Sequence, residues 1–357
     1  NKENILTQLP EKFIDEAILT ISSWDNYAPT PLIKLNKLND ELKFKNIYYK
    51  DEDKRFDLKS FKALGGAFAV YKIANEKKDI TVSTATAGNH GRSVAWGAQR
   101  LGLKCKIFIS EFVSESRAEA MRNLDAEVIR VKGNYDNSLK ECIEQSNKNN
   151  WEIVQDVSWE GYKEIPKLIM AGYTIMVKEI IDEIDKNAIT HVFLQAGVGG
   201  MAAAMIAGFA KLSENIPQFI IIEPENADCV FQSIKNNKPT TVDIKKETVM
   251  GGMSCGDVSS IAWEILKNSA NYCLTIPDEA ISITVALLAE KHLSDEKIIA
   301  GECAVPGIIA LIGSFNNKEY LDKLGLNEQS NVLLFGCEGL TDNAMYQKLL
   351  SDGLQKI

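Results

Sequence analysis

A lysine among apolar residues is the first feature of the chain that could do chemistry. Lys62 lies in the stretch Phe-Lys-Ala-Leu-Gly-Gly at residues 61–66, directly before a predicted amphipathic helix. Burial lowers the pKa of a lysine and leaves a free amine, which the formation of a Schiff base requires. Gly65 and Gly66 would let another part of the protein approach this backbone closely. The alternative is a surface lysine whose stem lies on apolar residues while its ammonium stays in water.

A glycine-rich segment between a predicted strand and a predicted helix could hold a phosphate. It reads Gly197-Val198-Gly199-Gly200 and follows the apolar run 191–195. Backbone N–H groups and the positive end of a helix dipole would meet there. A tight strand-to-helix turn is an equally open interpretation. The segment is not a Walker loop, because no Gly-Lys-Ser/Thr follows, and the spacing of a dinucleotide fingerprint is incomplete.

A second segment, Thr-Ala-Gly-Asn-His-Gly at residues 86–91, also joins a predicted strand to a predicted helix. Asn89 could donate a hydrogen bond to a ring hydroxyl or a carboxylate, and Gly88 would let a ligand come near the backbone. His90 could act as a base, or hydrogen bonds could hold it in the loop. The alternative is a helix cap at Ser93 with ordinary loop glycines.

Two polar side chains, Asp156 and Tyr162, follow another predicted strand. Open α/β sheets bind ligands beyond the carboxyl ends of their strands, so both side chains could face a substrate. Asp156 could instead cap a helix. The polar run 51–55, which leads into the lysine stretch, is expected to be a solvated loop.

These features together suit pyridoxal phosphate, a flat cofactor that carries an aldehyde and a phosphate. Lys62 would bind the aldehyde, the loop 197–200 the phosphate, and Asn89 the ring hydroxyl. The last predicted strand, at residues 331–335, would reach the ring nitrogen. Each feature has an ordinary alternative, but their joint occurrence in one chain favours the cofactor.

The elements that must position these residues alternate between strand and helix, which predicts parallel sheets with crossover helices. No internal repeat or low-complexity linker separates two halves. We therefore expect two interleaved open-sheet α/β domains with the cofactor between them. Residues 1–77 and 186–357 would form the large cofactor-binding domain, and residues 78–185 the small inserted domain. The predicted strands lie at 46–50, 80–84, 104–109, 126–131, 151–156, 191–195, 219–224 and 331–335, and one long helix is expected at 166–184.

The composition of the 357 residues favours a protein that binds small molecules. A net charge of −9 disfavours nucleic acid and anionic membranes as partners. Seven cysteines, an odd number without a C-x-x-C pair, and three histidines predict no disulfide framework and no metal site. No apolar run has transmembrane length, and the residues after Asn1 lack the apolar core of a signal peptide. We expect a cytoplasmic protein.

Nearly the whole chain resembles the fold-type-II pyridoxal-phosphate enzymes, the group of the tryptophan synthase β-chain and threonine dehydratase. Within that group it is most similar to diaminopropionate ammonia-lyase. The matching stretches are Phe61–Gly66, Gly88–Trp96, Val154–Tyr162, Leu194–Gly199, Ile222–Cys229, Met250–Gly256, Trp263–Leu266 and Gly301–Glu302.

The resemblance implies roles for individual residues and for the assembly. Lys62 matches the Schiff-base lysine, the loop 197–200 the phosphate loop, and Asn89 the residue at the ring hydroxyl. Asp156 matches an active-site carboxylate, and the resemblance implies a homodimer. We expect the substrate to contact Ala87, Gly88, His90, Asp156 and Tyr162.

The chain departs from the family pattern at two positions. Similar members carry an aspartate just before Gly-Asn-His-Gly, as the base for a D-substrate, and here that residue is Ala87. The stretch at the ring nitrogen, usually Ser-Thr-Glu-Gly, reads Gly-Cys-Glu-Gly at residues 336–339. Cys337 is then the expected partner of the ring nitrogen, and a thiol is a weaker hydrogen-bonding group than a hydroxyl.

The expected reaction is α,β-elimination of 2,3-diaminopropionate to pyruvate and ammonia, with the L-form preferred because Ala87 cannot move a proton. Lys62 would abstract the α-proton, and Asp156 would attract the second ammonium group of the substrate. One alternative is a lyase for another β-substituted alanine, such as serine, threonine or a sulfur-linked substrate. A non-catalytic amino-acid-binding homologue and a nicotinamide-dependent dehydrogenase are further alternatives, the latter disfavoured by the incomplete fingerprint.

Overall fold

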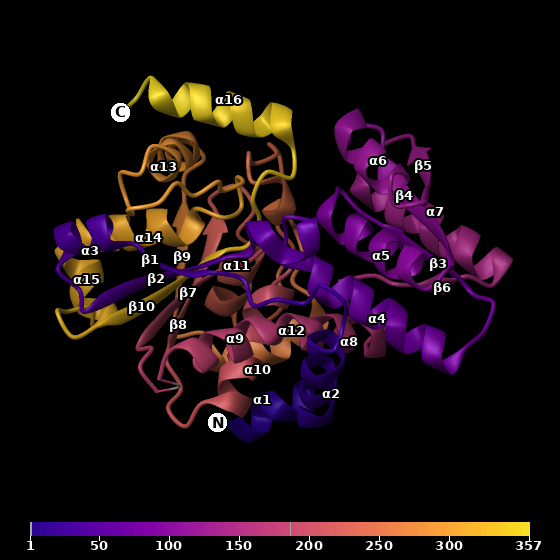
Figure 1. Cartoon of the computed structure of the whole chain (residues 1–357), viewed down its shortest axis with the longest axis horizontal. Helices are drawn as coiled ribbons and strands as arrows, with labels where there is room; N and C mark the ends of the chain where they lie inside the picture. Colours follow the sequence, from indigo (N-terminus) through magenta and orange to yellow (C-terminus); the bar gives the residue numbers. More distant parts are fainter. Residues whose placement is uncertain (1, 186) are drawn as a thin grey trace.

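Two β-sheets organise the computed structural model, which describes residues 2–185 and 187–357 (Figure 1). The larger sheet has the strand order β1-β2-β10-β7-β8-β9, and the smaller one the order β5-β4-β3-β6. Strand β1 runs antiparallel to β2, and the other neighbouring pairs in the described chain are parallel. The strands are β1 Leu32–Lys34, β2 Asn46–Asp51, β3 Thr81–Ala85, β4 Lys104–Ser110, β5 Glu127–Val131, β6 Glu152–Ile153, β7 His191–Gln195, β8 Gln218–Pro224, β9 Tyr272–Ile276 and β10 Asn331–Gly336.

Helices cover both sheets. In Figure 1, α10 and α14 lie on opposite faces of the larger sheet, and α5 and α7 flank the smaller one. The α-helices are α1 Lys2–Gln8, α2 Glu11–Ser22, α3 Asn36–Leu42, α4 Lys62–Glu76, α5 Asn89–Arg100, α6 Glu115–Arg122, α7 Tyr135–Asn149, α8 Glu164–Tyr173, α9 Ile175–Glu183, α10 Gly200–Leu212, α11 Cys229–Asn236, α12 Ser260–Ser269, α13 Glu279–Ala289, α14 Pro306–Phe315, α15 Lys318–Leu324 and α16 Asn343–Leu354; η1 Glu52–Asp57 and η2 Gly251–Met253 are 3₁₀ helices.

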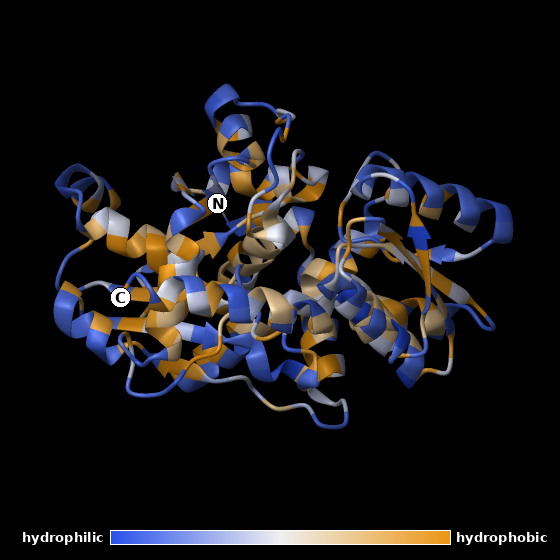
Figure 2. Ribbon diagram, turned by 90° about the horizontal axis from the view of Figure 1, so that it is seen from above, coloured by the Kyte–Doolittle hydropathy of each residue, from blue (hydrophilic) through white to orange (hydrophobic). Residues whose placement is uncertain are grey.

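The central strands are buried along their whole length. Every residue of β7 and β10 is buried, as expected for parallel strands that are covered on both faces. In Figure 2 the strands inside the molecule are coloured mostly as hydrophobic, and hydrophilic stretches gather on the outer helices and loops. Because residues 192–194 and 332–335 are continuously apolar, the sequence predicts both strands well, and both are confirmed.

Two predicted elements differ from the structure. The strand expected at 151–156 pairs only over β6, because the side-chain amide of Gln155 takes over from the backbone. It donates to Ala85 O at 3.0 Å and accepts from Ala85 N at 3.1 Å. The long helix expected at 166–184 is two helices, α8 and α9, separated by Thr174. The sequence does not predict β9, which is a half-buried edge strand.

Apart from the exposed Lys54, the polar run 51–55 is buried, so the prediction of a solvated loop is wrong. Arg55 is 1% exposed, and its guanidinium bonds Glu52 Oε2 at 2.8 Å and Glu179 Oε2 at 2.7 Å. Lys50 also pairs with Glu179, at 2.7 Å. Buried charges are tolerated when each has an opposite partner. The sequence could not reveal this network, because Glu179 lies on α9, far along the chain.

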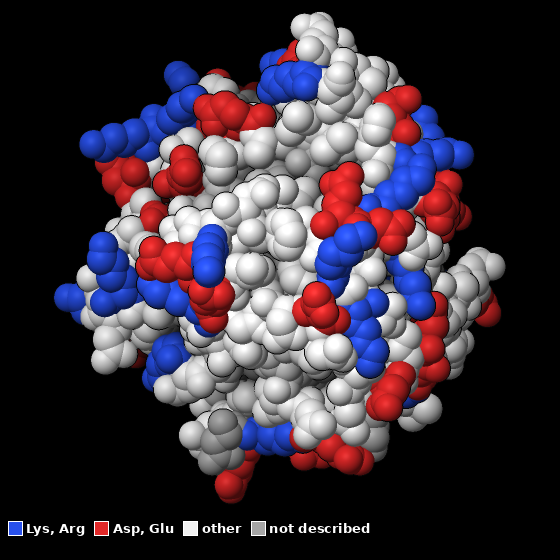
Figure 3. Space-filling model, turned by 90° about the vertical axis from the view of Figure 1, so that its left-hand side faces the viewer, with Lys and Arg blue, Asp and Glu red and all other residues white. Residues whose placement is uncertain are grey.

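The strands of the smaller sheet lie within 78–185 and those of the larger sheet outside it. The predicted division into residues 1–77 with 186–357 and residues 78–185 stays a prediction, and its limits at residues 1 and 186 lie outside the described residues. On the face shown in Figure 3, acidic and basic side chains are interspersed around an uncharged central area. Within the described chain, no helix combines the length and the apolar character that crossing a bilayer requires.

Candidate active site

The first turns of three helices bring the predicted site residues together. Helices α4, α5 and α10 start at Lys62, Asn89 and Gly200. The end of β10 is tied to the start of α4, because Phe61 N donates to Cys337 O at 3.0 Å. A Cβ placed on Gly200 would lie 3.9 Å from the backbone oxygen of Asp156. The site therefore lies between the two sheets, at the carboxyl ends of their strands.

Lys62 and Asp156 form an ion pair in this site. The Lys62 ammonium donates to Asp156 Oδ2, and the two side chains are 25% and 13% exposed. Burial works to lower the pKa of Lys62, but the Asp156 carboxylate outweighs it and raises that pKa above 10.5. Burial likewise works to raise the pKa of Asp156, but His90 and Lys62 hold it below 3.8. The expected lowering of the lysine pKa is thus wrong for this pair, because a partner 94 residues away reverses the effect of burial.

The glycines after Lys62 admit two neighbouring helices, as predicted. A Cβ on Gly65 would lie 2.5 Å from both Ile169 O and Tyr173 Cε1, on α8. A Cβ on Gly66 would lie 2.5 Å from Ser93 Oγ, on α5. Such distances are too short for any side chain. Helices α5 and α8 can therefore pack against the first turns of α4 only because Gly65 and Gly66 have no side chain.

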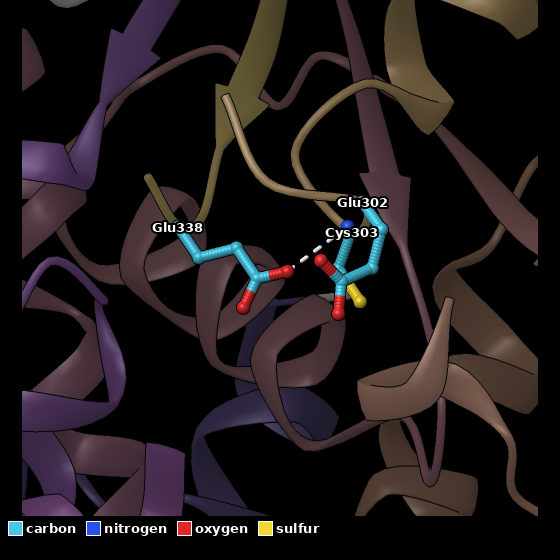
Figure 4. Close-up of side chains that lie close together, drawn as sticks. All are labelled: Glu302, Cys303 and Glu338. Carbon is cyan, nitrogen blue, oxygen red and sulfur yellow. Dashed lines mark hydrogen bonds between the residues drawn. The ribbon is translucent and has the colours of Figure 1, made fainter. Parts of the chain in front are cut away.

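Asn89 is hydrogen-bonded to Glu338, just beyond the end of β10, a residue that was not among the predicted site residues. Asn89 Nδ2 donates to Glu338 Oε2 at 2.5 Å, and Cys303 N donates to Glu338 Oε1 at 3.0 Å. Figure 4 shows Glu338 beside Cys303 and Glu302. Glu338 is 4% exposed and lies two residues beyond the end of the buried strand β10. A buried acid at a strand end is the signal that could have identified it.

Cys337, the predicted partner of a ring nitrogen, uses its thiol on the main chain. Its Sγ donates to Cys303 O at 3.1 Å. Burial raises the pKa of Cys337 well above 9.0, so the group stays a thiol at neutral pH. The same carbonyl accepts from Gln195 Nε2 at 2.9 Å.

An arginine on α6, which packs beside the smaller sheet, contacts acidic residues in loops beside the larger sheet. Arg117, on α6, donates to Glu302 Oε1 at 3.1 Å and to Ala87 O at 3.4 Å, and its Nε lies 3.3 Å from Asp342 Oδ2. Burial, followed by the charge of Glu338, raises the pKa of Glu302 to about 7. The ligating atoms of Glu302, Cys303 and Glu338 lie within 4.8 Å of one another. The carboxylates already have hydrogen-bond partners, so we assign no metal ion to this group.

His90 is fixed by its loop. Its Nε2 lies 2.8 Å from Val154 O, and because a carbonyl only accepts, Nε2 carries the proton. Burial lowers the pKa of His90, which favours the neutral ring. The Nδ1 atom lies 3.8 Å from Asp156 Oδ2 and makes no hydrogen bond within the described chain.

The hydroxyl of Tyr162, which was expected to face a substrate, bonds to the backbone of its own turn. The hydroxyl donates to Ile153 O and accepts from Gln155 N, both at 2.8 Å. The ring stacks on Trp159 with centroids 4.2 Å apart. Tyr162 therefore closes the turn that holds Asp156 in place.

The loop 197–200 has the form of an anion site. Gly199 has a φ of 89°, in the left-handed region, and Gly200 opens α10, whose first N–H groups have no partner inside the helix. A Cβ on Gly197 would lie 3.0 Å from Cys255 Sγ and from Gly252 O. The backbone thus bends closely around this point and presents donors to an anion. With the part-buried amine of Lys62 nearby, these residues fit pyridoxal phosphate.

Comparison with known proteins agrees with this fit. Residues 24–335 match the family described as "Pyridoxal-phosphate dependent enzyme". The chain is 34% identical to diaminopropionate ammonia-lyase of Escherichia coli K12, over 92% of this chain and 88% of that one. It is also 34% identical to the enzyme of Salmonella typhimurium, over 92% of this chain and 89% of that one.

Solved structures give the same result. The Escherichia coli ammonia-lyase in complex with an aminoacrylate-PLP azomethine reaction intermediate superposes with a TM-score of 0.90, at 33% identity over 97% of this chain and 93% of that one. Its complex with D-serine gives 0.91, at 32% identity and the same coverage. Tomato threonine deaminase, at 21% identity, shares the fold with a TM-score of 0.80. With a family match over residues 24–335 and similarity along almost its full length to these enzymes, the chain belongs to the fold-type-II pyridoxal-phosphate dependent enzymes.

Proposed function

We propose that this chain is an ammonia-lyase that converts 2,3-diaminopropionate to pyruvate and ammonia by α,β-elimination. The observation that carries the proposal is the Lys62–Asp156 ion pair, an amine beside a carboxylate, with the backbone oxygen of Asp156 next to the loop 197–200. The similarity to diaminopropionate ammonia-lyases over 92% of the chain supports it.

The residues divide the work as follows. Bound pyridoxal phosphate supplies an electron sink that makes the α-proton of the substrate acidic. The N-terminus of α10 holds the phosphate, and Asn89, braced by Glu338, binds the ring hydroxyl. Lys62, once free of the cofactor, takes the α-proton as a neutral amine. Asp156 binds the β-ammonium and keeps it protonated, so that the group leaves as neutral ammonia with the electron pair of the broken C–N bond.

Asp156 also explains the choice of substrate. A carboxylate in a largely buried site attracts an ammonium, whereas a substrate with a neutral β-group would leave Asp156 paired with Lys62, whose amine would then stay charged. Serine and threonine carry a hydroxyl at the β-carbon and are poorer substrates on this argument.

The preference for the L-form rests on Ala87, whose exposed methyl side chain cannot take a proton. We expect pyruvate release from L-2,3-diaminopropionate to exceed that from the D-isomer by at least about tenfold, since one general base contributes about 10²- to 10⁴-fold. Ala87→Asp should raise the rate on the D-isomer, and Ala87→Asn, of similar size, should not. Equal rates on both isomers with the parent enzyme would contradict the preference.

We also propose that the protein is a cytoplasmic homodimer with the two domains defined above. The family resemblance supports the dimer, and seven free cysteines suit a reducing compartment. Within the site, Gly88 and His90 are proposed to contact the substrate. Light scattering of the purified protein would give the mass of the assembly directly, and a mass near 39.6 kDa would contradict the dimer.

A further inference from the structure

One buried tyrosine beside the site has a hydroxyl without a partner. Tyr173 ends α8 and is 2% exposed. Its Oη makes no hydrogen bond to any described residue. A buried hydroxyl in that condition is unfavourable, and it calls for an explanation such as a partner that arrives in another state of the protein.

The hydroxyl end of Tyr173 lies over the first turn of α4. The ring packs edge-on against Phe61, with centroids 4.7 Å apart, and a Cβ on Gly65 would lie 2.5 Å from Tyr173 Cε1. The ammonium of Lys62 is close enough to influence the pKa of Tyr173, although the two groups do not form a hydrogen bond of ordinary geometry. Tyr173 is therefore the unpartnered neighbour of the Lys62 amine.

The proposed reaction changes the partner of that amine. Lys62 now donates to Asp156, yet the same carboxylate is the proposed seat of the substrate's β-ammonium. When the substrate binds, Lys62 loses its partner in a largely buried place. A tyrosine hydroxyl can accept an N–H from an ammonium or donate its O–H to the lone pair of a neutral amine, whereas a carboxylate can only accept. Burial raises the pKa of Tyr173, so the hydroxyl keeps its proton at neutral pH.

We propose that Tyr173 is a positioning residue for Lys62. Its hydroxyl forms a hydrogen bond with the Lys62 amine when Asp156 pairs with the substrate instead. The proposal rests on the proposed function for the identity of that substrate. It gives the unpartnered hydroxyl a role that neither the family resemblance nor the sequence assigns.

Tyr173→Phe tests this role, because it removes the oxygen and keeps the ring on Phe61. Tyr346→Phe is the matched control, since Tyr346 also has a buried hydroxyl without a partner but lies on α16, outside the site. With L-2,3-diaminopropionate, we expect kcat of Tyr173→Phe to fall about 10- to 100-fold, the range for a hydrogen bond to a charged group, with KM changed less than about twofold. A substrate deuterated at the α-carbon should show a larger isotope effect on kcat in this variant. Tyr346→Phe should match the parent in kcat, in KM and in the isotope effect on kcat.

A second measurement needs no turnover. The rate at which added pyridoxal phosphate gains its visible absorbance band reports how well Lys62 is held. We expect Tyr173→Phe to change this rate less than about twofold while Asp156 is present. In an Asp156→Asn background Tyr173 is the remaining partner, and its loss should slow the rate about tenfold.

The outcomes separate the proposal from the function on which it rests. If the parent binds the coenzyme but releases no pyruvate from diaminopropionate, the proposed function fails, and the uptake measurement still decides the role of Tyr173. If Tyr173→Phe equals Tyr346→Phe in both backgrounds, the role is refuted. A melting temperature of Tyr173→Phe far below the parent's would refute it too, because the hydroxyl would then support the fold and not the amine.

Discussion

At the scale of single residues, the Lys62–Asp156 pair sets the protonation state of the key amine. Burial acts to lower the pKa of Lys62, and Asp156 reverses that direction. Because Asp156 stabilises the ammonium, the amine must be released from this carboxylate before it can act as a base. The proposed arrival of a β-ammonium at Asp156 would provide that release, which couples substrate binding to activation of the base.

Asp156→Asn tests this coupling. The change should lower turnover of L-2,3-diaminopropionate at least about tenfold more than turnover of L-serine, because only the former loses a charge partner. The pKa of Lys62 should fall, since its raised pKa depends on Asp156, so coenzyme uptake should reach its half-maximal rate at a lower pH than in the parent. Steady-state assays with both substrates and uptake rates from pH 6 to 10 measure these effects. An equal loss for the two amino acids would remove Asp156 from substrate recognition.

The residues that the sequence identifies are those with an unusual local setting. Lys62 stands among apolar residues, and Asn89 stands between loop glycines, so both are visible without a structure. Glu338 could have been identified by its place just beyond an apolar strand, but the role proposed for Tyr173 could not, because it depends on what the ring faces across the fold. Tyr162 was expected at the substrate, and its hydroxyl is instead used by the backbone of its own turn.

At the scale of elements, the close crossing of α4 and α8 positions the lysine. Gly65 meets Gly172 there, since a Cβ on Gly172 would lie 2.8 Å from Gly65 Cα. Gly65→Ala should therefore destabilise the protein by about 1–3 kcal/mol through overpacking and weaken coenzyme binding by shifting Lys62. Gly313→Ala on α14 is the control, because a Cβ there meets nothing within 4 Å and should stabilise the helix by about 0.5–1 kcal/mol. Urea denaturation compares the two, and a neutral Gly65→Ala would show that the crossing can relax.

Elements follow from sequence where burial is continuous and fail where a distant side chain intervenes. The middle of β7, at residues 192–194, and of β10, at residues 332–335, is apolar, and the prediction of both strands needs no tertiary knowledge. By contrast, β6 is short because the side-chain amide of Gln155 replaces its backbone pairing. The helix η1 is buried because Glu179 on α9 pairs with Arg55 on η1 and with Lys50 on β2. Local pattern cannot show such long-range polar partners.

At the scale of the whole molecule, Arg117 connects the two sheets across the site. It extends from α6 to Glu302 and Asp342, which precede α14 and α16. The interleaved topology could be predicted from the order of strands and helices. The acidic group that Arg117 contacts, Glu302 and Asp342, could not be predicted, because these residues come from separate loops that only the fold brings together.

That acidic group gives the protein a pH dependence that Glu302→Gln should reveal. Burial and Glu338 raise the pKa of Glu302 to about 7 in the fold, above its ordinary value of 4.5. Its favourable contribution is therefore complete below pH 4.5 and is lost as the pH rises through 7. We expect the unfolding free energy of the parent to decline between pH 5 and 8, and that of Glu302→Gln to decline less, by about 1–3 kcal/mol over the range. Glu328→Gln, at an exposed position, should follow the parent. Parallel curves for all three proteins in urea denaturation would show that Glu302 is ionised throughout this range and that Arg117 fully compensates its burial.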